Sequence, residues 1–245
     1  THKTPLLFIH GYPLSGEMWR PTVERLGDRW RCVVPDLRGH GQSSVSASVT
    51  IAQFADDLAE LLDKLGENQP AVIVGLSMGG IVAFEFFRRH RARVRALVLV
   101  DTRANAETAE GVARRNTLAD ATLRDGSQVV ADALIDGVFA PGVRPDLRAH
   151  WYDLMARTPP VGAAAASRAL AQREESFSTL PRIDCPTLVV VGAKDSITPV
   201  ETLREIHRGI RGSRFEIIPE AGHLPPVEQP DHFARVLRSF LEGLT

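Results

Sequence analysis

Residues 72–80, with the sequence VIVGLSMGG, decide the fold of this chain. They open with an apolar, β-branched run of the kind that forms a buried parallel strand. The strand pattern stops at Gly75, and a helical pattern begins at Met78. A turn this tight has no room for side chains two positions either side of Ser77, where the sequence has Gly75 and Gly79. We therefore expect Ser77 in a strained turn above the sheet, with its hydroxyl exposed.

The helix after Ser77 gives this serine a chemical setting. Its first N–H groups and the positive end of its dipole face the serine, which favours an anion there. The five-residue pattern G-x-S-x-G occurs by chance in roughly one chain in ten of this size. A glycine-rich turn with an uninvolved serine is therefore the alternative, and the strand before and helix after favour a nucleophile.

Length and charge limit the class of protein. The chain has 245 residues and a net charge of −1. This length suits one large α/β domain with an insertion, and the charge gives no indication of nucleic acid or an anionic membrane as partner. No apolar run approaches the ~20 residues of a membrane span, and no signal peptide is visible. We expect a cytoplasmic protein.

Further strands are expected on either side of the serine turn. Apolar runs at 5–9, 32–35, 94–100, 187–191 and 214–218 alternate with helical patterns at about 18–26, 50–65, 200–210 and 228–244. Thr50 and Gln53 form a capping-box pattern at the start of one of these helices. Such alternation predicts a parallel sheet covered on both faces, with ligands bound at the carboxyl ends of the strands. The residues that follow strands there are His10, Asp36, Ser77, Asp101 and Asp195.

The middle of the chain breaks the alternation. No strand pattern is visible in residues 103–177, and four helices are expected at about 105–124, 127–138, 145–157 and 160–174. We predict that residues 1–102 and 178–245 form the core, and that residues 103–177 form a helical lid over the strand ends. A purely structural appendage is the alternative. Lids exclude water and set the shape of the substrate.

A serine nucleophile needs a base, and the base needs an acid to orient it. His223 is the candidate base, because it lies in a Gly/Pro-rich loop after the last strand. Asp195 follows another strand and is the candidate acid, although it could instead cap the helix ahead of Pro199. Asp101 is the reserve acid. The order Ser77, Asp195, His223 differs from that of the chymotrypsin and subtilisin types.

An oxyanion hole needs two N–H donors. We assign one to the backbone of Met78 and the other to the backbone of Tyr12, because Pro13 has no N–H. Trp151, Met155 and Leu224 are expected to line the substrate pocket. This chemistry requires no metal and no cofactor, and its expected partner is a small-molecule substrate.

Two neighbouring segments are expected to be structural. His10 is interpreted as a brace for the loop that carries Tyr12. The run from Asp36 to Ser43 is interpreted as a loop held by its own hydrogen bonds and an Asp/Arg pair, with ligand contact by His40 as the alternative.

The motifs together resemble the α/β-hydrolase superfamily over nearly the whole chain. They are His10-Gly11, the D-x-R-G-H-G-x-S run from Asp36, the G-x-S-x-G turn, the Asp195 loop and Gly222-His223. Residues 155–174 are similar to the lid of the enol-lactonase, carboxylesterase and cofactor-free haloperoxidase-like branch, 3-oxoadipate enol-lactonase among them. A serine nucleophile argues against the haloalkane dehalogenase and epoxide hydrolase branches, whose chemistry needs a carboxylate.

The resemblance implies hydrolysis of a small carboxylic ester or lactone through an acyl-enzyme on a Ser-His-Asp triad. Carbon–carbon bond hydrolysis, perhydrolysis or a hydroxynitrile lyase reaction on the same triad remain alternatives, because function is grafted on the fold. A ligand receptor with slow turnover is a further alternative. The sequence does not indicate an oligomeric state.

Overall fold

The computed structural model describes residues 4–244. Its centre is a sheet of six parallel strands in the order β2-β1-β3-β4-β5-β6. The strands are β1 (Pro5–Ile9), β2 (Arg31–Val33), β3 (Ala71–Leu76), β4 (Val94–Val100), β5 (Thr187–Gly192) and β6 (Arg214–Ile218). β1, β3 and β5 are buried along their whole length, as expected for strands without polar alternation.

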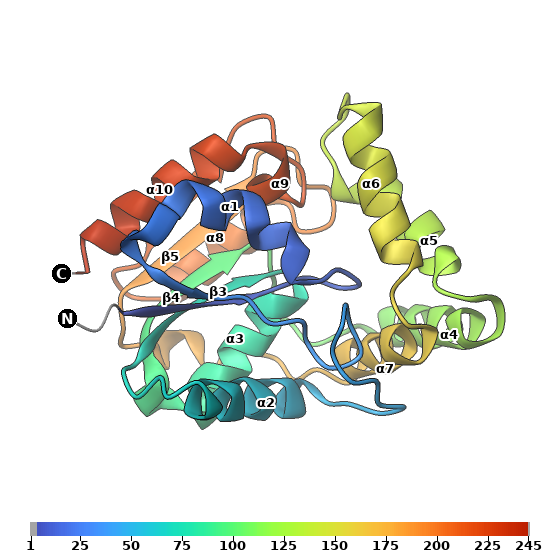
Figure 1. Cartoon of the computed structure of the whole chain (residues 1–245), viewed down its shortest axis with the longest axis horizontal. Coiled ribbons are helices and arrows are strands. Elements are labelled where there is room, and N and C mark those ends of the chain that lie inside the picture. Colours follow the sequence, from blue (N-terminus) through green and yellow to red (C-terminus); the bar gives the residue numbers. More distant parts are fainter. Residues whose placement is uncertain (1–3, 245) are drawn as a thin grey trace.

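Helices cover both faces of this sheet (Figure 1). α1 (Arg20–Leu26) and α10 (Pro230–Glu242) lie on one face, and α2 (Ile51–Lys64) and α3 (Met78–Arg89) lie on the other. α8 (Val200–Gly209) packs into the same apolar cluster as α2 and α3. The predicted parallel sheet between two helical layers is confirmed.

Successive residues of each strand pack alternately into two separate apolar clusters, one on each face of the sheet. Leu7, Ile73 and Val189 point to the side of α2 and α3. The neighbouring residues point to the side of α1 and α10, and they include Leu6 and Val72. Each fully buried side chain of this size stabilises the fold by about 1.5–3 kcal/mol. This two-sided burial fixes the register of the strands and therefore the position of every strand end.

Several helix ends follow the local sequence. Thr50 and Gln53 cap α2 reciprocally, because each side chain accepts the other's backbone N–H, at 3.1 and 2.8 Å. The last helix, expected over 228–244, is divided into α9 (Pro225–Glu228) and α10. Helical dihedrals are unfavourable for a residue that precedes a proline. Gln229 precedes Pro230 and has non-helical dihedrals, φ −131° and ψ 56°, so α9 and α10 are separate.

Residues 103–177 contain helices and no strand. The helices are α4 (Ala109–Asp125), α5 (Gln128–Val138), α6 (Pro145–Ala156) and α7 (Pro160–Ala171), and they lie to one side of the sheet in Figure 1. α4 begins later than expected because the Thr108 side chain caps it, accepting the Gly111 N–H at 3.0 Å. α4 packs on α7, and α5 packs on α6.

Short helical turns complete the chain at Gly16–Trp19, Gly27–Arg29, Arg91–Arg93 and Leu180–Arg182. None of the helices within residues 4–244 combines the length and the apolar character needed to cross a membrane.

Candidate active site

Ser77 occupies the sharp turn between β3 and α3. Its φ of 54° and ψ of −112° are rare for a residue with a side chain. Neighbouring groups hold this geometry: the Ser77 N–H donates to the Val100 carbonyl at 2.9 Å, and the Thr102 hydroxyl donates to the Ser77 carbonyl at 2.7 Å. Strain held in place in this way is typical of a functional residue.

The glycines around Ser77 are required by close packing. A Cβ on Gly75 would lie 2.2 Å from the Gly79 carbonyl oxygen, and a Cβ on Gly79 would lie 2.1 Å from the Ile9 carbonyl oxygen. Both obstacles are backbone atoms, which a rotamer change cannot move. The absence of these two side chains lets α3 start directly above the end of β1.

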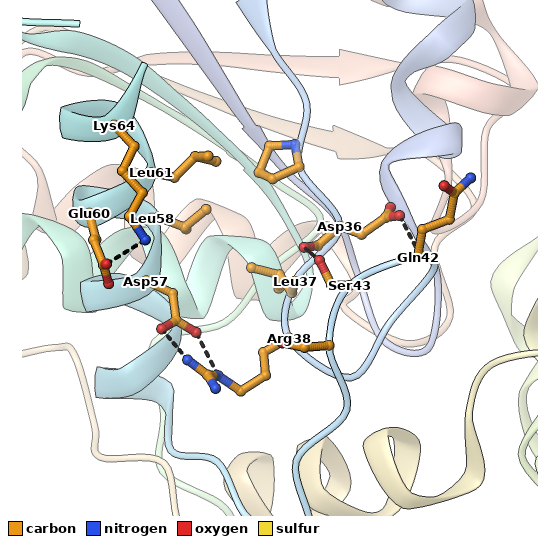
Figure 2. A pocket seen from close by; sticks show the side chains of 12 residues that line it. Asp36, Leu37, Arg38, Gln42, Ser43, Asp57, Leu58, Glu60, Leu61 and Lys64 are labelled. Atoms are coloured by element: carbon orange, nitrogen blue, oxygen red, sulfur yellow. Dashed lines mark hydrogen bonds and ion pairs between the residues drawn. The ribbon is translucent and has the colours of Figure 1, made fainter. Parts of the chain in front are cut away.

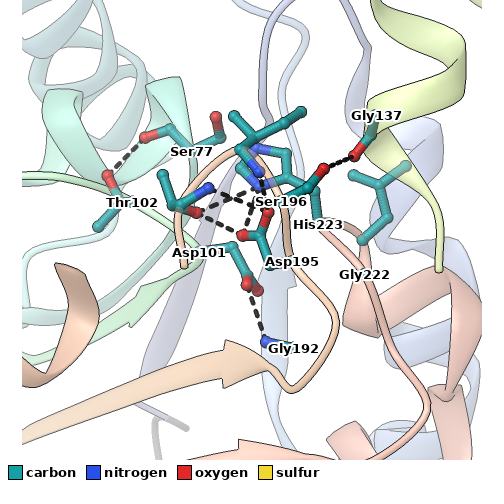
Figure 3. A network of polar contacts seen from close by, with 12 residues as sticks. Ser77, Asp101, Thr102, Gly137, Gly192, Asp195, Ser196, Gly222 and His223 are labelled. Carbon is teal, nitrogen blue, oxygen red and sulfur yellow. Dashed lines mark hydrogen bonds and ion pairs between the residues drawn. The ribbon is translucent and has the colours of Figure 1, made fainter. Parts of the chain in front are cut away.

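His223 and Asp195 form a buried hydrogen bond. The His223 Nδ1 lies 2.8 Å from Asp195 Oδ2, and the two residues are 4% and 6% exposed. An ionised carboxylate only accepts, so Nδ1 donates, and this tautomer leaves the lone pair on Nε2. Figure 3 shows Ser77 above this pair, with the three side chains coming from different strand ends.

Several donors hold the Asp195 carboxylate in its ionised form. Oδ1 accepts the N–H groups of Ile197 at 2.8 Å and Thr198 at 3.0 Å, and Oδ2 also accepts the Thr198 hydroxyl. Burial raises the pKa of Asp195, but the charge and hydrogen bond of His223 and the hydrogen bonds from Asp101 and Thr198 outweigh it. The net pKa is lowered to about 2.

Asp101, the reserve acid, is placed differently. It is fully buried, its Oδ1 accepts the Gly192 N–H at 2.8 Å, and its Oδ2 has no donor. Burial and the neighbouring charge of Asp195 raise its pKa well above the ordinary value, which favours the neutral form of the carboxyl. The structure thus sets Asp195, and not Asp101, against His223.

Glu228 positions the loop that carries His223. Its carboxylate accepts the N–H groups of Gly222 at 2.9 Å, Leu224 at 3.2 Å and Ala140 at 2.7 Å. The His223 N–H donates to the Val138 carbonyl at 3.0 Å, which ties the same loop to the end of α5. The sequence analysis missed Glu228; its place five residues after His223, at a helix end, was the available signal.

A cavity of about 460 Å³ opens beside Ser77 and His223. Tyr12 and Met78, the predicted oxyanion-hole residues, both line it. His10 braces the Tyr12 loop, since its Nδ1 donates to the Gly11 carbonyl and its Nε2 accepts the Leu37 N–H, both at 2.9 Å. Burial lowers the pKa of His10 to about 4, so the imidazole is neutral. Of the five residues predicted for the triad and the oxyanion hole, four line this cavity, and the fifth, Asp195, is hydrogen-bonded to His223.

The predicted pocket residues do not line this cavity. Trp151 and Met155 of α6 and Leu224 are nearly fully buried in the apolar cluster shared with α1 and α10. Burial in this cluster removes their large apolar surfaces from water, which stabilises the fold more than an exposed position in the cavity would. The apolar lining comes instead from α4, α5 and α7, through Leu118, Leu134, Val138 and Leu170.

The polar wall of the cavity was also missed. Thr102, Arg103 and Thr198 line it together with Glu107 and Arg115. Arg103 comes two residues after Asp101 at the end of β4, which is the available signal, because residues at that position reach the strand ends.

A second cavity, also of about 460 Å³, lies between the Asp36 loop and α2 (Figure 2). Arg38 pairs there with Asp57 at 2.6 Å and not with Asp36, which corrects the expected pair within the loop. The Asp36 carboxylate instead accepts the N–H groups of Gly16 and Gln42, both at 2.8 Å. His40 is buried against the His10 ring and is not among the residues lining either cavity. Hydrogen bonds from Gly16 and Gln42 to Asp36 and the Arg38–Asp57 ion pair hold this loop in place.

Comparison with known proteins agrees with the geometry. The solved structure of a thermophilic esterase from Thermogutta terrifontis, with malate bound, is 39% identical and superposes with a TM-score of 0.97, covering 99% of this chain and 91% of its own. The enol-lactonase from Burkholderia xenovorans LB400 is 26% identical with a TM-score of 0.90, covering 99% of this chain and 92% of its own.

A curated relative gives the same indication. The 3-oxoadipate enol-lactonase 1 of Acinetobacter baylyi is 30% identical over 98% of this chain and 89% of its own length. Residues 4–230 match the family model described as alpha/beta hydrolase fold. The chain belongs to the α/β-hydrolase family.

Proposed function

We propose that this protein is a serine hydrolase that cleaves a small carboxylic ester or lactone through an acyl-enzyme. The observation that carries the proposal is the 2.8 Å hydrogen bond between His223 Nδ1 and Asp195, because His223 lines the same cavity as Ser77. The esterase and enol-lactonase relatives support the same substrate class.

The reaction follows from this arrangement. His223 Nε2 takes the Ser77 proton as Oγ attacks the carbonyl carbon, and the Asp195 carboxylate stabilises the imidazolium that forms. The backbone N–H groups of Tyr12 and Met78 bind the oxyanion, which is worth about 3–4 kcal/mol per donor in such sites. His223 then protonates the leaving oxygen, and a water that it activates hydrolyses the acyl-enzyme.

We further propose that residues 103–177 act as a lid. Leu118 of α4, Leu134 of α5 and Leu170 of α7 contribute apolar side chains to the cavity that Ser77 also lines. A lid of this kind excludes water from the charged transition state and limits the size of the acyl group.

Hydrolysis of short-chain nitrophenyl esters and small lactones tests the function. We expect turnover by the wild type, a burst of nitrophenol from acyl-enzyme accumulation, and loss of at least about 10³-fold in Ser77→Ala. Ser178→Ala, at an exposed serine whose N–H and hydroxyl both donate to Glu175, is the matched control. Residual Ser77→Ala activity within tenfold of wild type would overturn the assignment. A folded wild type inactive on every ester and lactone would favour the carbon–carbon hydrolase, lyase and receptor alternatives.

A further inference from the structure

Positive charge predominates around the cavity beside Ser77. Three arginines and one glutamate line it: Arg103, Arg114, Arg115 and Glu107. Glu107 is already shared, because its Oε2 accepts from Arg115 Nε at 2.6 Å and from Arg173 Nη1 at 2.7 Å. One carboxylate therefore serves two guanidinium groups, and Arg103 and Arg114 have no carboxylate partner in residues 4–244.

Arg103 is the arginine best placed to meet a ligand. It follows Thr102, whose hydroxyl donates to the Ser77 carbonyl, so it lies one residue from the serine turn. Its Nη2 donates to the Ile197 carbonyl at 2.6 Å, which fixes the side chain between the end of β4 and the Asp195 loop. A guanidinium has five N–H donors, and this bond uses one of them.

The electrostatic surroundings of Arg103 are unfavourable without a ligand. Burial lowers the pKa of Arg103, and the charges of Arg173 and Arg115 lower it further, while the charges of Glu107 and Asp195 raise it without offsetting the decrease. Since an arginine does not lose its proton in a protein, the repulsion remains in the folded state. A bound anion would relieve it.

We propose that this cavity selects an ester or lactone that carries a carboxylate group, with Arg103 as the main partner of that carboxylate. The inference rests on the proposed hydrolase function and narrows its substrate class. The guanidinium fork matches a carboxylate with two parallel hydrogen bonds, which gives both affinity and orientation. The apolar side chains from α4, α5 and α7 would then contact the short carbon chain between the two carbonyl groups.

Matched pairs of substrates test the proposal. 4-Nitrophenyl butyrate and the 4-nitrophenyl monoester of succinic acid have similar acyl chains, but only the second is anionic. Phenyl acetate and 4-acetoxybenzoate place the charge on the leaving group instead. We expect the anionic member of at least one pair to have a kcat/KM about tenfold or more above its neutral counterpart, mainly through KM, and we expect salt to reduce this ratio.

Substitutions assign the preference to Arg103. Arg103→Gln should lower the anionic-to-neutral ratio of kcat/KM by about tenfold, and Arg103→Lys should retain most of it, because the charge remains. Arg114→Gln, at an exposed position on the rim, should lower the ratio less. Arg208→Gln, at an exposed residue of α8, is the control and should leave the ratio unchanged.

The outcomes separate the two proposals. If Arg103 only holds the Asp195 loop, Arg103→Gln lowers both activities equally and the ratio stays constant, which overturns the inference. Equal rates on both members of both pairs in the wild type also overturn it, while ester hydrolysis itself stands. No hydrolysis of any of the four esters would instead remove the proposed function, and the inference with it.

Discussion

The carboxyl of Asp101 and the ionised carboxylate of Asp195 belong to one buried group with His223, with an oxygen of each within 4.8 Å of the other. Two like charges this close repel each other strongly in a buried site, which raises the pKa of Asp101, while the donors around Asp195 lower the pKa of Asp195. The negative charge of this pair therefore resides on Asp195, the residue that is hydrogen-bonded to His223.

Asp195→Asn should reduce kcat by about 10³–10⁴-fold. The amide can present an N–H to His223 and so favour the wrong tautomer, and it does not stabilise the imidazolium. Steady-state kinetics on a nitrophenyl ester measure the loss, and circular dichroism checks that the fold is intact. A loss below about tenfold would contradict the role given to Asp195.

Asp101→Asn should keep activity within about tenfold of wild type, because a neutral amide still accepts the Gly192 N–H and adds no charge beside Asp195. Asp101→Leu has no acceptor and leaves the Gly192 N–H unpaired, which should cost about 1–3 kcal/mol of unfolding free energy along with activity. Denaturant unfolding and kcat for both variants provide the comparison. If Asp101→Asn proved as damaging as Asp195→Asn, Asp101 would be the acid of the triad.

Acid should destabilise the fold between about pH 6.5 and pH 4. Burial lowers the pKa of His10 to about 4 and that of His40 to about 3, against 6.5 when unfolded. The unfolded chain then binds more protons, so stability is fully present above pH 6.5 and is lost as pH falls through this window. At pH 4.5 each histidine accounts for about 2–3 kcal/mol of the loss. Urea unfolding at pH 7 and 4.5 measures it.

The control for this prediction is the exposed His150, whose substitution His150→Gln should leave the pH dependence unchanged. His40→Asn should flatten the decline between the two pH values, whatever its effect on stability at pH 7. An unchanged slope in that variant would show that the buried imidazole is not the group that titrates.

Gly75→Ala should destabilise the protein by about 3 kcal/mol or more, because the new Cβ would lie 2.2 Å from the Gly79 carbonyl oxygen. For a chain of this size that corresponds to a fall in Tm of about 6–12 °C. The matched control is Gly137→Ala in α5, where a Cβ would meet Ile197 at an ordinary 3.6 Å. That change should be neutral or stabilise by about 0.5–1 kcal/mol, since alanine favours a helix. Thermal unfolding of both variants tests the difference in sign.

Glu107→Gln should cost about 3–5 kcal/mol of unfolding free energy. The Arg173 side chain is 1% exposed, and removal of the carboxylate leaves its charge buried and unpaired. Asp120→Asn removes an exposed ion pair with Arg168 and should change stability by less than about 1 kcal/mol. If the two substitutions lowered the free energy of unfolding equally, the buried network would contribute no more to stability than the exposed ion pair does.

The fold and the triad follow from local sequence signals. The apolar runs define every strand, and the VIVGLSMGG turn, the Asp195 loop and Gly222-His223 place their polar residues at the same edge of the sheet. The pocket does not follow from such signals. Whether Trp151 or Leu118 faces the cavity depends on how the four helices of residues 103–177 pack on one another. Both are apolar residues of helical segments, so the sequence alone does not tell which of them lines the cavity. Arg103 and Glu228 were missed because their roles depend on partners distant in the chain.

The two ends of residues 103–177 are joined to each other before they reach the core. Ser176 donates its N–H to the Ala104 carbonyl at 2.6 Å, and Arg173 Nε donates to the Asn105 carbonyl at 3.0 Å. The end of α5 is joined to the core as well, because the Val138 carbonyl accepts the His223 N–H and the Ala140 N–H donates to Glu228. Changes in the length of α4 or α7 between the two clasps would therefore leave the strand ends in place, whereas changes at the end of α5 would move the loop that carries His223. Substrate preference can vary through α4 and α7 while the end of α5 keeps its position.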